Sequence, residues 1–408
     1  MNLYYFISKR ILNTDRKDFS SLVSKISVAS ITLGLALLIL AFGILEGFRN
    51  TIQDKIFSFA AHLQITKHDV TRSQDEAPMT IFSDLYQHPD SIQGIRHIQV
   101  FSHKPGLMRT SEDVMGVVLK GIGTDFNLNE FQQNIIEGNF IEFKDSVPSR
   151  DILISRRIGN LMQLDVNDSV IVIFAQAGAE AAKFRKLHVA GKYDTGLEEF
   201  DEQVIIGDIK LNQELNNWPE SKVGGYEIFV DDFRRIDEIA DDVFEYMDYD
   251  MQLQKVTDKY IQIFDWLILL NRNVYIFLAL ILFIASFNMV STLLIMIMER
   301  TNMIGLLKAL GTTNEQIQKI FIYNGMLIIR KGLVWGNLLG LGLCFIQYYF
   351  KVIPLDAENY YMEHVPIEWN WWVIAGLNIL TLFIITVVLL IPAMIIARIN
   401  PIKAIKFS

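Results

Sequence analysis

The sequence predicts an α-helical membrane domain of four transmembrane helices and an α+β extracytoplasmic domain of two lobes, inserted between the first and second helices. Three observations lead to this prediction. Hydrophobic residues make up 51% of the 408 residues, which is more than soluble proteins usually contain. They gather in four runs, each close to the roughly 20 apolar residues that cross a bilayer as a helix. The long stretch between the first two runs has the mixed composition of a water-exposed domain.

The first transmembrane helix is predicted at residues 26–45, which contain no charged side chain. A cleaved signal peptide is the alternative interpretation. A signal peptide has a short basic segment and an apolar core of about 7–15 residues. The run in this chain is longer and follows an extended basic segment, 1–25. We therefore favour a retained helix with segment 1–25 in the cytoplasm.

Two further helices are predicted from similar runs. The second covers residues 274–298, where Asn288 is the only strongly polar side chain, and the fourth covers residues 371–397. Tryptophans at the start of the fourth run are typical of the aromatic belt at a membrane interface. These tryptophans are Trp369, Trp371 and Trp372.

The third helix is predicted at 333–349 because Arg330 and Lys331 interrupt a longer apolar stretch. A basic residue at the centre of a membrane helix costs about 2.5–3.5 kcal/mol on insertion scales. At the membrane interface, the same residue can extend its charge into water. The flanking segments are then a cytoplasmic coupling loop with an interfacial helix (299–332) and a periplasmic loop (350–370).

Glycines spaced four residues apart give the third helix a smooth face, at Gly332, Gly336 and Gly340. Small residues at this spacing allow another helix to approach closely. The alternative is that these glycines only relax the packing of lipid around the helix. We interpret them as a helix-packing face.

Basic residues predict the orientation, because loops rich in Lys and Arg stay in the cytoplasm. They concentrate before the first helix, after the second helix and in the tail (398–408). The loop at 350–370 instead carries one lysine against four acidic residues. Both termini and the coupling loop are therefore predicted to be cytoplasmic, and residues 46–273 to lie outside. The single cysteine, Cys344, is not in this outer segment, so the segment has no disulfide, which fits a periplasmic domain on a bacterial inner membrane.

The periplasmic domain is predicted to mix strands with helices. Residues 170–174 and 226–230 have the composition of strands. Residues 233–247 have apolar side chains at helical spacing, and the acidic side chains opposite them form a solvated face. We expect two lobes, one formed by 49–115 together with 225–260 and the other by the inserted residues 116–224.

No motif for catalysis or metal binding stands out. The seven histidines include no pair four residues apart and none near a cysteine, so nothing indicates a zinc site. No G-x-x-x-x-G-K-[ST] motif occurs, so an ATPase would be a separate chain. The net charge of −9 argues against a nucleic-acid partner. The chain is therefore predicted to be a non-catalytic membrane subunit that binds no cofactor or metal itself.

The loop after the second helix is the most informative stretch. Residues Asn302 to Leu310 are predicted to form a short amphipathic helix that Gly311 ends. A capping box is available to start the next helix, from either Thr313 with Gln316 or Thr312 with Glu315. Because this short helix is joined directly to two transmembrane helices, a push on it would move both.

Several motifs resemble the FtsX/MacB-type permeases of ABC transporters. ERTNMIGLLKALGTTNEQI (299–317) is similar to their coupling loop, and ARINPIKAIKF (397–407) is similar to their C-terminal signature. Within that group, the LolC/LolE lipoprotein-releasing permeases share further motifs. FNMVSTLLIMIMER (287–300) resembles their second helix, GILEGFRNTIQDKI (43–56) their first, and VAGKYDTGLEEFDE (189–202) their outer domain.

This resemblance implies a dimer of permease chains, either two copies of this chain or this chain with a second one. It also implies two copies of an ABC ATPase that bind ATP and Mg. The cargo would be lipoproteins taken from membrane lipid by mechanotransmission and passed to a periplasmic carrier. In the family, a hook rich in Pro, Met and Gly recruits this carrier, but the corresponding segment 175–186 lacks that pattern. A MacB-like efflux permease and an FtsX-like regulator of a cell-wall hydrolase are the alternative functions.

The resemblance also points to candidate site residues. Contact with the ATPase is expected at Glu299, Arg300, Met303, Gly305, Leu306, Lys308 and Leu310. For Glu299 and Arg300, a simple interfacial flank is the alternative. Cargo would pass between the first helix of one chain and the second helix of the other, along Phe42, Leu45, Phe48, Ser286, Phe287, Asn288 and Ser291. For most of these, ordinary helix packing is the alternative.

Overall fold

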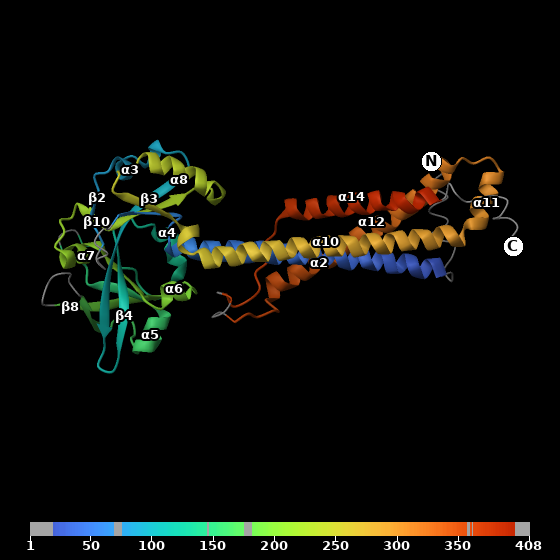
Figure 1. The fold of residues 1–408 in the computed structure, drawn as a ribbon. Helices are drawn as coiled ribbons and strands as arrows, with labels where there is room; N and C mark the ends of the chain where they lie inside the picture. Colours follow the sequence, from blue (N-terminus) through green and yellow to red (C-terminus); the bar gives the residue numbers. More distant parts are fainter. Residues whose placement is uncertain are drawn as a thin grey trace. The chain divides into compact units, whose positions relative to one another are not determined.

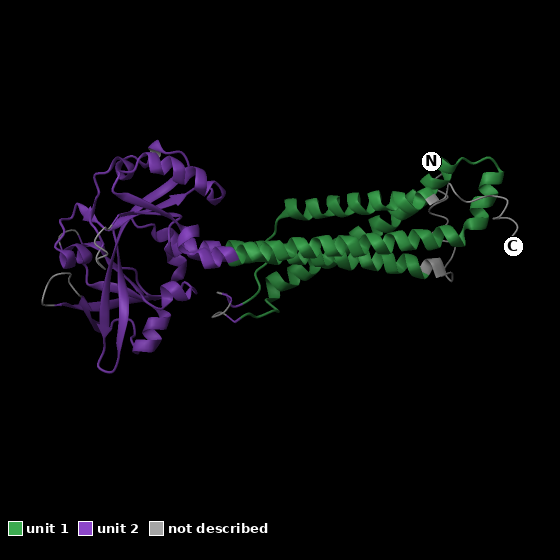
Figure 2. Cartoon of the chain, in the orientation of Figure 1, with its two compact units in different colours: residues 1–50, 266–355, 364–408 green, residues 51–265, 356–363 purple. Residues whose placement is uncertain are grey.

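The computed structural model describes residues 19–68, 76–144, 147–174, 182–356, 360 and 362–395 (Figure 1). Two compact units make up the chain (Figure 2). The helical unit comprises Met1–Asn50, Trp266–Leu355 and His364–Ser408, and the sheet unit comprises Thr51–Asp265 with Asp356–Glu363. The predicted tail, 398–408, and most of segment 1–25 lie outside the described residues.

Among the described residues, four helices are long and apolar enough to cross a membrane, as predicted. They are α2 (Phe19–Phe59), α10 (Ile261–Glu299), α12 (Asn314–Phe350) and α14 (Trp371–Ile395). A short helix, α11 (Thr301–Ala309), lies between α10 and α12. The mixed α and β elements lie between α2 and α10 in the sequence, which confirms the predicted fold class.

Two of these helices extend well beyond the predicted transmembrane segments. α2 has 41 residues, although only 26–45 was predicted to cross the membrane, and α10 has 39 residues against the predicted 274–298. At 1.5 Å per residue, α2 is about 62 Å long, roughly twice the thickness of a bilayer core. Hydropathy identifies only the section that suits lipid, whereas a helix continues wherever its backbone hydrogen bonds can form.

α12 continues without a break through Arg330 and Lys331, which are both exposed. The predicted interfacial helix and the predicted third span at 333–349 therefore belong to one helix of 37 residues. A helical backbone tolerates long basic side chains on its outer face, since they do not disturb its hydrogen bonds. Where the membrane lies along this helix stays a prediction.

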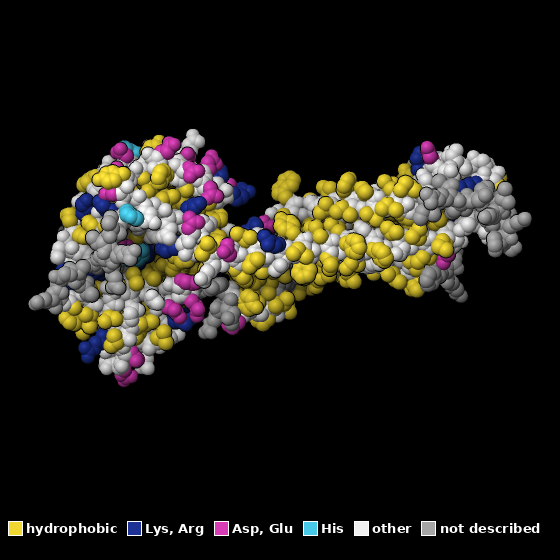
Figure 3. All heavy atoms as spheres, in the orientation of Figure 1, with side chains coloured by type: hydrophobic (Ala, Val, Ile, Leu, Met, Phe, Trp, Pro, Cys, Tyr) yellow, Lys and Arg dark blue, Asp and Glu magenta, His cyan; other side chains and the backbone are white. Residues whose placement is uncertain are grey.

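Side chains from all four long helices and α11 form the core of the helical unit. Ile31 of α2, Met289 of α10, Ile304 of α11, Phe321 of α12 and Leu389 of α14 are buried in one cluster. Hydrophobic side chains also dominate the visible outer surface of these helices, whereas charged side chains are scattered over the sheet unit (Figure 3). Helices that are apolar on all sides are typical of membrane proteins.

The sheet unit is built on one sheet of ten strands. In sequence order they are β1 (Leu63–Lys67), β3 (Ile95–Arg109), β4 (Val114–Ile122), β5 (Ile135–Gly138), β6 (Asp151–Ser155), β7 (Ser169–Phe174), β8 (Lys183–Tyr193), β9 (Val204–Asp208), β11 (Gly225–Val230) and β12 (Met251–Lys255). Neighbouring strands follow the order β12-β1-β11-β3-β4-β9-β6-β8-β5, and β7 pairs with both β3 and β8. The pairs β4–β9 and β6–β8 are parallel, and the other pairs are antiparallel.

Six of these strands close into a ring, in the order β3-β4-β9-β6-β8-β7. The long strand β3 allows this closure, because its residues 95–101 pair with β11 and its residues 106–109 pair with β7. All six strands contribute to one buried cluster, which includes Met108, Ile154 and Val172. Because β3 pairs with strands of both predicted lobes, one sheet joins them, and the lobe boundaries stay a prediction.

Shorter elements connect and cover the strands. They are β2 (Met79–Thr80), α3 (Asp84–Gln87), η1 (Pro89–Ser91), α4 (Leu128–Phe131), η2 (Gln132–Asn134), α5 (Arg156–Met162), α6 (Glu198–Asp201), α7 (Ile209–Asn216), β10 (Lys222–Val223), η3 (Phe233–Arg235), α8 (Ile236–Glu245) and α9 (Val256–Lys259). The strands predicted at 170–174 and 226–230 correspond to β7 and β11. The helix predicted at 233–247 corresponds to η3 and α8.

Asp201, the last residue of α6, makes the stability of the sheet unit depend on pH. Burial raises the pKa of this carboxyl from 3.8 to about 6, although hydrogen bonds from Thr195 and Gly196 act to lower the pKa. Since the folded-state pKa exceeds the unfolded one, the stabilisation is fully present below about pH 4 and is lost as the pH rises through about 6. We expect the melting temperature of the purified chain to fall over this interval. The melting temperature of an Asp201→Asn variant should fall less over the same interval. The melting temperature of the control Glu112→Gln, in an exposed turn, should follow that of the wild type. Equal pH dependence of the melting temperature in Asp201→Asn and the wild type would contradict the assignment of this effect to Asp201.

Candidate coupling site and membrane bundle

α11 is connected to both neighbouring helices by short turns with defined hydrogen bonds. The Thr301 hydroxyl donates a hydrogen bond to the Met298 carbonyl at 2.7 Å, close to the end of α10. After α11, Gly311 adopts a φ of +90°, a left-handed conformation that glycine accepts without strain. Thr313 and Gln316 then form the capping box of α12. The predicted short helix, its glycine stop and one of the two proposed capping boxes are thus confirmed.

The two faces of α11 have different surroundings. Ile304 is fully buried, and Met303 and Leu307 pack against the same cluster in the helical unit. On the other face, Leu306 and Leu310 are 57% and 75% exposed. These two leucines are four residues apart and therefore adjacent on the helix surface. They form an apolar pair that a partner protein could cover.

The residues predicted to contact an ATPase do not share one surface. Leu306, Leu310 and Glu299 are exposed, whereas Gly305 is buried and Met303 belongs to the inner face. Arg300 and Lys308 are half-buried. The seven residues come from one contiguous motif. Successive residues of a helix point about 100° apart, so a contiguous motif occupies all sides of the helix. Their role in coupling stays a prediction.

The three spaced glycines of α12 lie directly against α2. Gly332, Gly336 and Gly340 are all buried. A Cβ atom added at Gly332 would lie 2.6 Å from Cβ of Ile31, and one added at Gly340 would lie 3.0 Å from Cα of Ala36. The helices therefore approach so closely that even a methyl group does not fit without movement.

Three of the seven residues predicted to line a cargo route, Phe42, Phe48 and Asn288, make contacts between α2 and α10, which run side by side in Figure 1. The ring of Phe42 lies 5.9 Å from that of Tyr275, and the ring of Phe48 lies 6.3 Å from that of Trp266. The Asn288 amide donates to the Ser30 hydroxyl at 2.8 Å. These contacts within one chain also fit ordinary helix packing.

The remaining members of this set differ in exposure. Phe287 is 63% exposed, and the Ser291 hydroxyl donates to its carbonyl at 3.0 Å. Ser286 is buried, and its hydroxyl has no hydrogen-bond partner among the residues that the structure describes. Leu45 is half-buried. Phe287 therefore faces outward, where lipid, cargo or a second chain could reach it. The cargo route stays a prediction.

A polar contact within the bundle was not anticipated from the sequence. The side-chain amides of Asn337 on α12 and Asn378 on α14 exchange two hydrogen bonds, of 2.7 and 2.9 Å. The available signal was an asparagine in each of two apolar runs, because side-chain amides in membrane helices usually bond across helices. No group of three His, Cys, Asp or Glu side chains suited to a metal ion occurs among the described residues.

Comparison with known proteins agrees with the architecture of the bundle. Residues 275–401, which include α11, α12 and α14, match the family model of the FtsX-like permease C-terminal domain. The chain thus contains an FtsX-like permease domain. Over its whole length it is similar to lipoprotein-releasing system transmembrane proteins. It is 22% identical to LolC of Neisseria meningitidis, with 100% of both chains covered. It is also 22% identical to LolE of Haemophilus influenzae, again with 100% of both covered.

Two solved structures resemble part of the chain. The extracellular domain of the ABC-type transporter YknZ from Gram-positive bacteria matches 47% of this chain and 99% of that domain, with a TM-score of 0.31 and 12% identity. The periplasmic region of MacB from Actinobacillus actinomycetemcomitans matches 52% of this chain and 95% of that region, with a TM-score of 0.35 and 12% identity.

Proposed function

We propose that this chain is the permease subunit of an ATP-driven ABC complex that extracts lipoproteins from the outer leaflet of the inner membrane for transfer to a periplasmic carrier. The observation that carries this proposal is the similarity to LolC and LolE over the entire length of the chain, periplasmic-type domain included. The FtsX-like domain and the four apolar helices support the permease part of the proposal.

The chemistry of the cargo explains why such a complex needs ATP. Removing an acyl chain from a bilayer costs about 0.8 kcal/mol for each CH₂ group, so a cargo with several chains is retained strongly. This sequence has no phosphate-binding loop of the G-x-x-x-x-G-K-[ST] type. We therefore assign ATP hydrolysis, with its Mg, to two copies of a separate ATPase.

The proposed mechanism transmits force through α11. The exposed pair Leu306 and Leu310 would dock into an ATPase, while Ile304 and its neighbours hold α11 to the bundle. A displacement of α11 would then move α10 and α12, which it joins. In this proposal, α11 and both termini are cytoplasmic and the sheet unit is periplasmic.

Two permease chains are expected in the complex. The chain is similar to both LolC and LolE at the same identity, so two copies of this chain and a mixed pair are both compatible with the proposal. The hook segment at 175–186 mostly lies outside the described residues. Direct binding of a carrier to this chain is left to experiment.

Purification of the complex from its own membranes tests the proposed function. The tagged chain is extracted in mild detergent, and its partners and lipids are identified by mass spectrometry. We expect an ABC ATPase together with acylated lipoproteins, and release of those lipoproteins to a soluble fraction when ATP is added. Recovery of a cell-wall hydrolase, or of an efflux adaptor and channel without lipoproteins, would overturn the proposal.

A further inference from the structure

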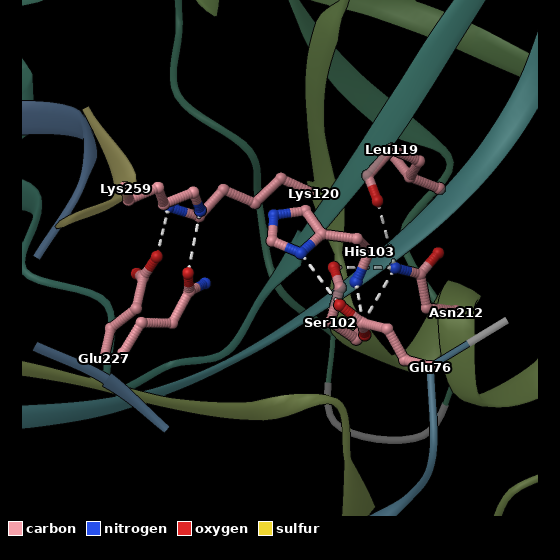
Figure 4. Close-up of polar contacts among 9 residues, drawn as sticks. Glu76, Ser102, His103, Leu119, Lys120, Asn212, Glu227 and Lys259 are labelled. Carbon is pink, nitrogen blue, oxygen red and sulfur yellow. Dashed lines mark hydrogen bonds and ion pairs between the residues drawn. The ribbon is translucent and has the colours of Figure 1, made fainter. Parts of the chain in front are cut away.

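A buried lysine fastens the end of α2 to the sheet. Lys120 on β4 is 3% exposed, and its ammonium donates to the Glu227 carboxylate at 2.7 Å and to the Phe59 carbonyl at 2.9 Å. Figure 4 shows Lys120 and Glu227 meeting in the interior of the sheet unit. The ammonium also lies 4.8 Å from the centre of the Phe59 ring, a distance suited to a cation–π contact.

Phe59 lies at the C-terminal end of α2, where a helix needs hydrogen-bond donors from outside. Phe59 is the last residue of α2, and the final carbonyls of a helix have no donor within the helix itself. The C-terminal end of a helix also carries partial negative charge, which a cation stabilises. Lys120 therefore supplies both the missing donor and the complementary charge.

Glu227 extends the contact to two further strands. It lies on β11 and is 3% exposed, and its second carboxylate oxygen accepts a hydrogen bond from the side chain of Gln99 on β3 at 2.8 Å. β4 belongs to the closed ring of strands, whereas β11 lies outside it. One ion pair thus connects the end of α2 to both parts of the sheet.

The start of α10 lies close to the same charges. Lys259, which is labelled in Figure 4, lies two residues before α10 begins. It donates a hydrogen bond to the Gln64 side chain on β1 at 2.8 Å. Phe59, Lys120, Glu227 and Lys259 all line one cavity of about 230 Å³. The end of α2 and the start of α10 therefore both lie close to Glu227 in the sheet.

The energetics of a buried ion pair indicate a role other than stability. Removing two charges from water costs about as much as their attraction returns, so an apolar pair of similar size usually serves folding equally well. What the ion pair adds is geometry, because a hydrogen-bonded pair holds its elements at one distance and orientation. Loosely matched apolar side chains would allow the end of α2 to shift.

We propose that the Lys120–Glu227 pair is a positioning joint that fixes the end of α2 to the sheet, so that a displacement of α2 moves the extracytoplasmic domain as one body. The effect of this joint on lipoprotein release rests on the proposed function above. The fixation of α2 to the sheet does not rest on it, because this fixation concerns only contacts among Phe59, Lys120 and Glu227 within the sheet unit.

The first test separates positioning from stability. The variant Lys120→Met/Glu227→Leu replaces the pair by apolar side chains and leaves no single charge buried. The control Lys255→Met/Asp237→Leu removes a more exposed pair, of 2.7 Å, between β12 and α8. In the complete complex, we expect both variants to keep the wild-type melting temperature and ATPase rate. The amount of lipoprotein released per ATP hydrolysed should fall at least about fivefold in Lys120→Met/Glu227→Leu and should not change in the control. A factor of about five is the lower end of the range usual for coupling between two sites.

The second test measures fixation directly in the full-length chain. Spin labels are attached at the exposed positions Asp54, in α2, and Glu112, in the turn between β3 and β4, in a Cys344→Ser background. We expect a narrow distance distribution in the wild type and in the control, and a broader one in Lys120→Met/Glu227→Leu. If that variant does not fold, Glu227→Gln, which keeps the side-chain shape and removes the charge, is measured in its place.

The two tests have distinguishable outcomes. A spin-label distance distribution in Lys120→Met/Glu227→Leu that is as narrow as in the wild type would contradict the fixation of α2 by this ion pair, whatever the function of the complex. Unchanged release per ATP in a variant with a broadened distribution would overturn its role in transmission. A wild-type complex that hydrolyses ATP without releasing lipoproteins would instead contradict the proposed function and leave the fixation result to stand by itself.

Discussion

Replacing both Leu306 and Leu310 with aspartate is expected to abolish ATP-driven release while the chain remains folded. Both side chains are largely exposed, Leu306 on the outer face of α11 and Leu310 directly after its last residue. The core of the helical unit is therefore untouched. Burying one leucine is worth about 1.5–3 kcal/mol. Losing two such contacts should therefore weaken binding of the ATPase roughly a hundredfold or more. Co-purification of the ATPase and release of lipoproteins from membrane vesicles are the measurements.

Two variants in the same helix sharpen this test. Asn302→Asp adds a negative charge at an exposed position of α11 without removing an apolar contact, and it should behave as the wild type. Ile304→Asp places a charge at a fully buried position and should prevent folding, which detergent gel filtration would reveal. Normal ATPase binding by the double leucine variant would show that the exposed face of α11 is not the contact surface.

A second large effect is expected when Gly332 is replaced by valine. A Cβ atom at this position would already lie 2.6 Å from Cβ of Ile31, so α2 and α12 must separate to accept the side chain. Overpacking of this kind costs about 1–3 kcal/mol, and the melting temperature of the detergent-purified chain should fall by roughly 2–6 °C. Tryptophan fluorescence during heating measures the change.

The matched control is Gly342→Ala on the same helix. Apart from the adjoining backbone of α12 itself, no atom of the described residues lies within 4 Å of a Cβ at this position. Alanine favours a helix over glycine by up to about 1 kcal/mol. The melting temperature of this variant should therefore equal or exceed that of the wild type. Equal decreases in melting temperature for Gly332→Val and Gly342→Ala would mean that the loss of any glycine destabilises α12, and that the close contact with α2 is not the cause.

Composition and spacing predicted the membrane part of this protein well. Four apolar runs corresponded to four helices, and the Gly311 stop and the capping box at Thr313 appeared where expected. These features depend on residues close together in the sequence, so local physical chemistry is sufficient to predict them. The helices α2 and α10 continue beyond the predicted membrane segments, because hydropathy reports a preference for lipid and does not report where a helix ends.

The candidate site was predicted only in part. The short helix expected after the second long helix is present as α11, and its role in coupling stays a prediction. Its division into a buried face around Ile304 and an exposed face with Leu306 depends on how α11 rests against the bundle. Phe42 and Asn288 were selected as possible cargo contacts, and both make contacts within the chain as well. Sequence position alone does not distinguish a side chain that faces a partner from one that faces its own neighbour.

The sequence by itself determined the class of architecture: four helices apolar enough to cross a membrane, a mixed domain between the first two, and a short helix between the second and third. Only the tertiary structure decided how the strands close into a ring through β3, and which charges meet inside it. Lys120 and Glu227 are separated by 107 positions and Lys120 and Phe59 by 61. Their contact exists because the sheet brings β4 beside the end of α2. Such long-range contacts leave no periodic pattern in the sequence, since they result from the packing of whole elements.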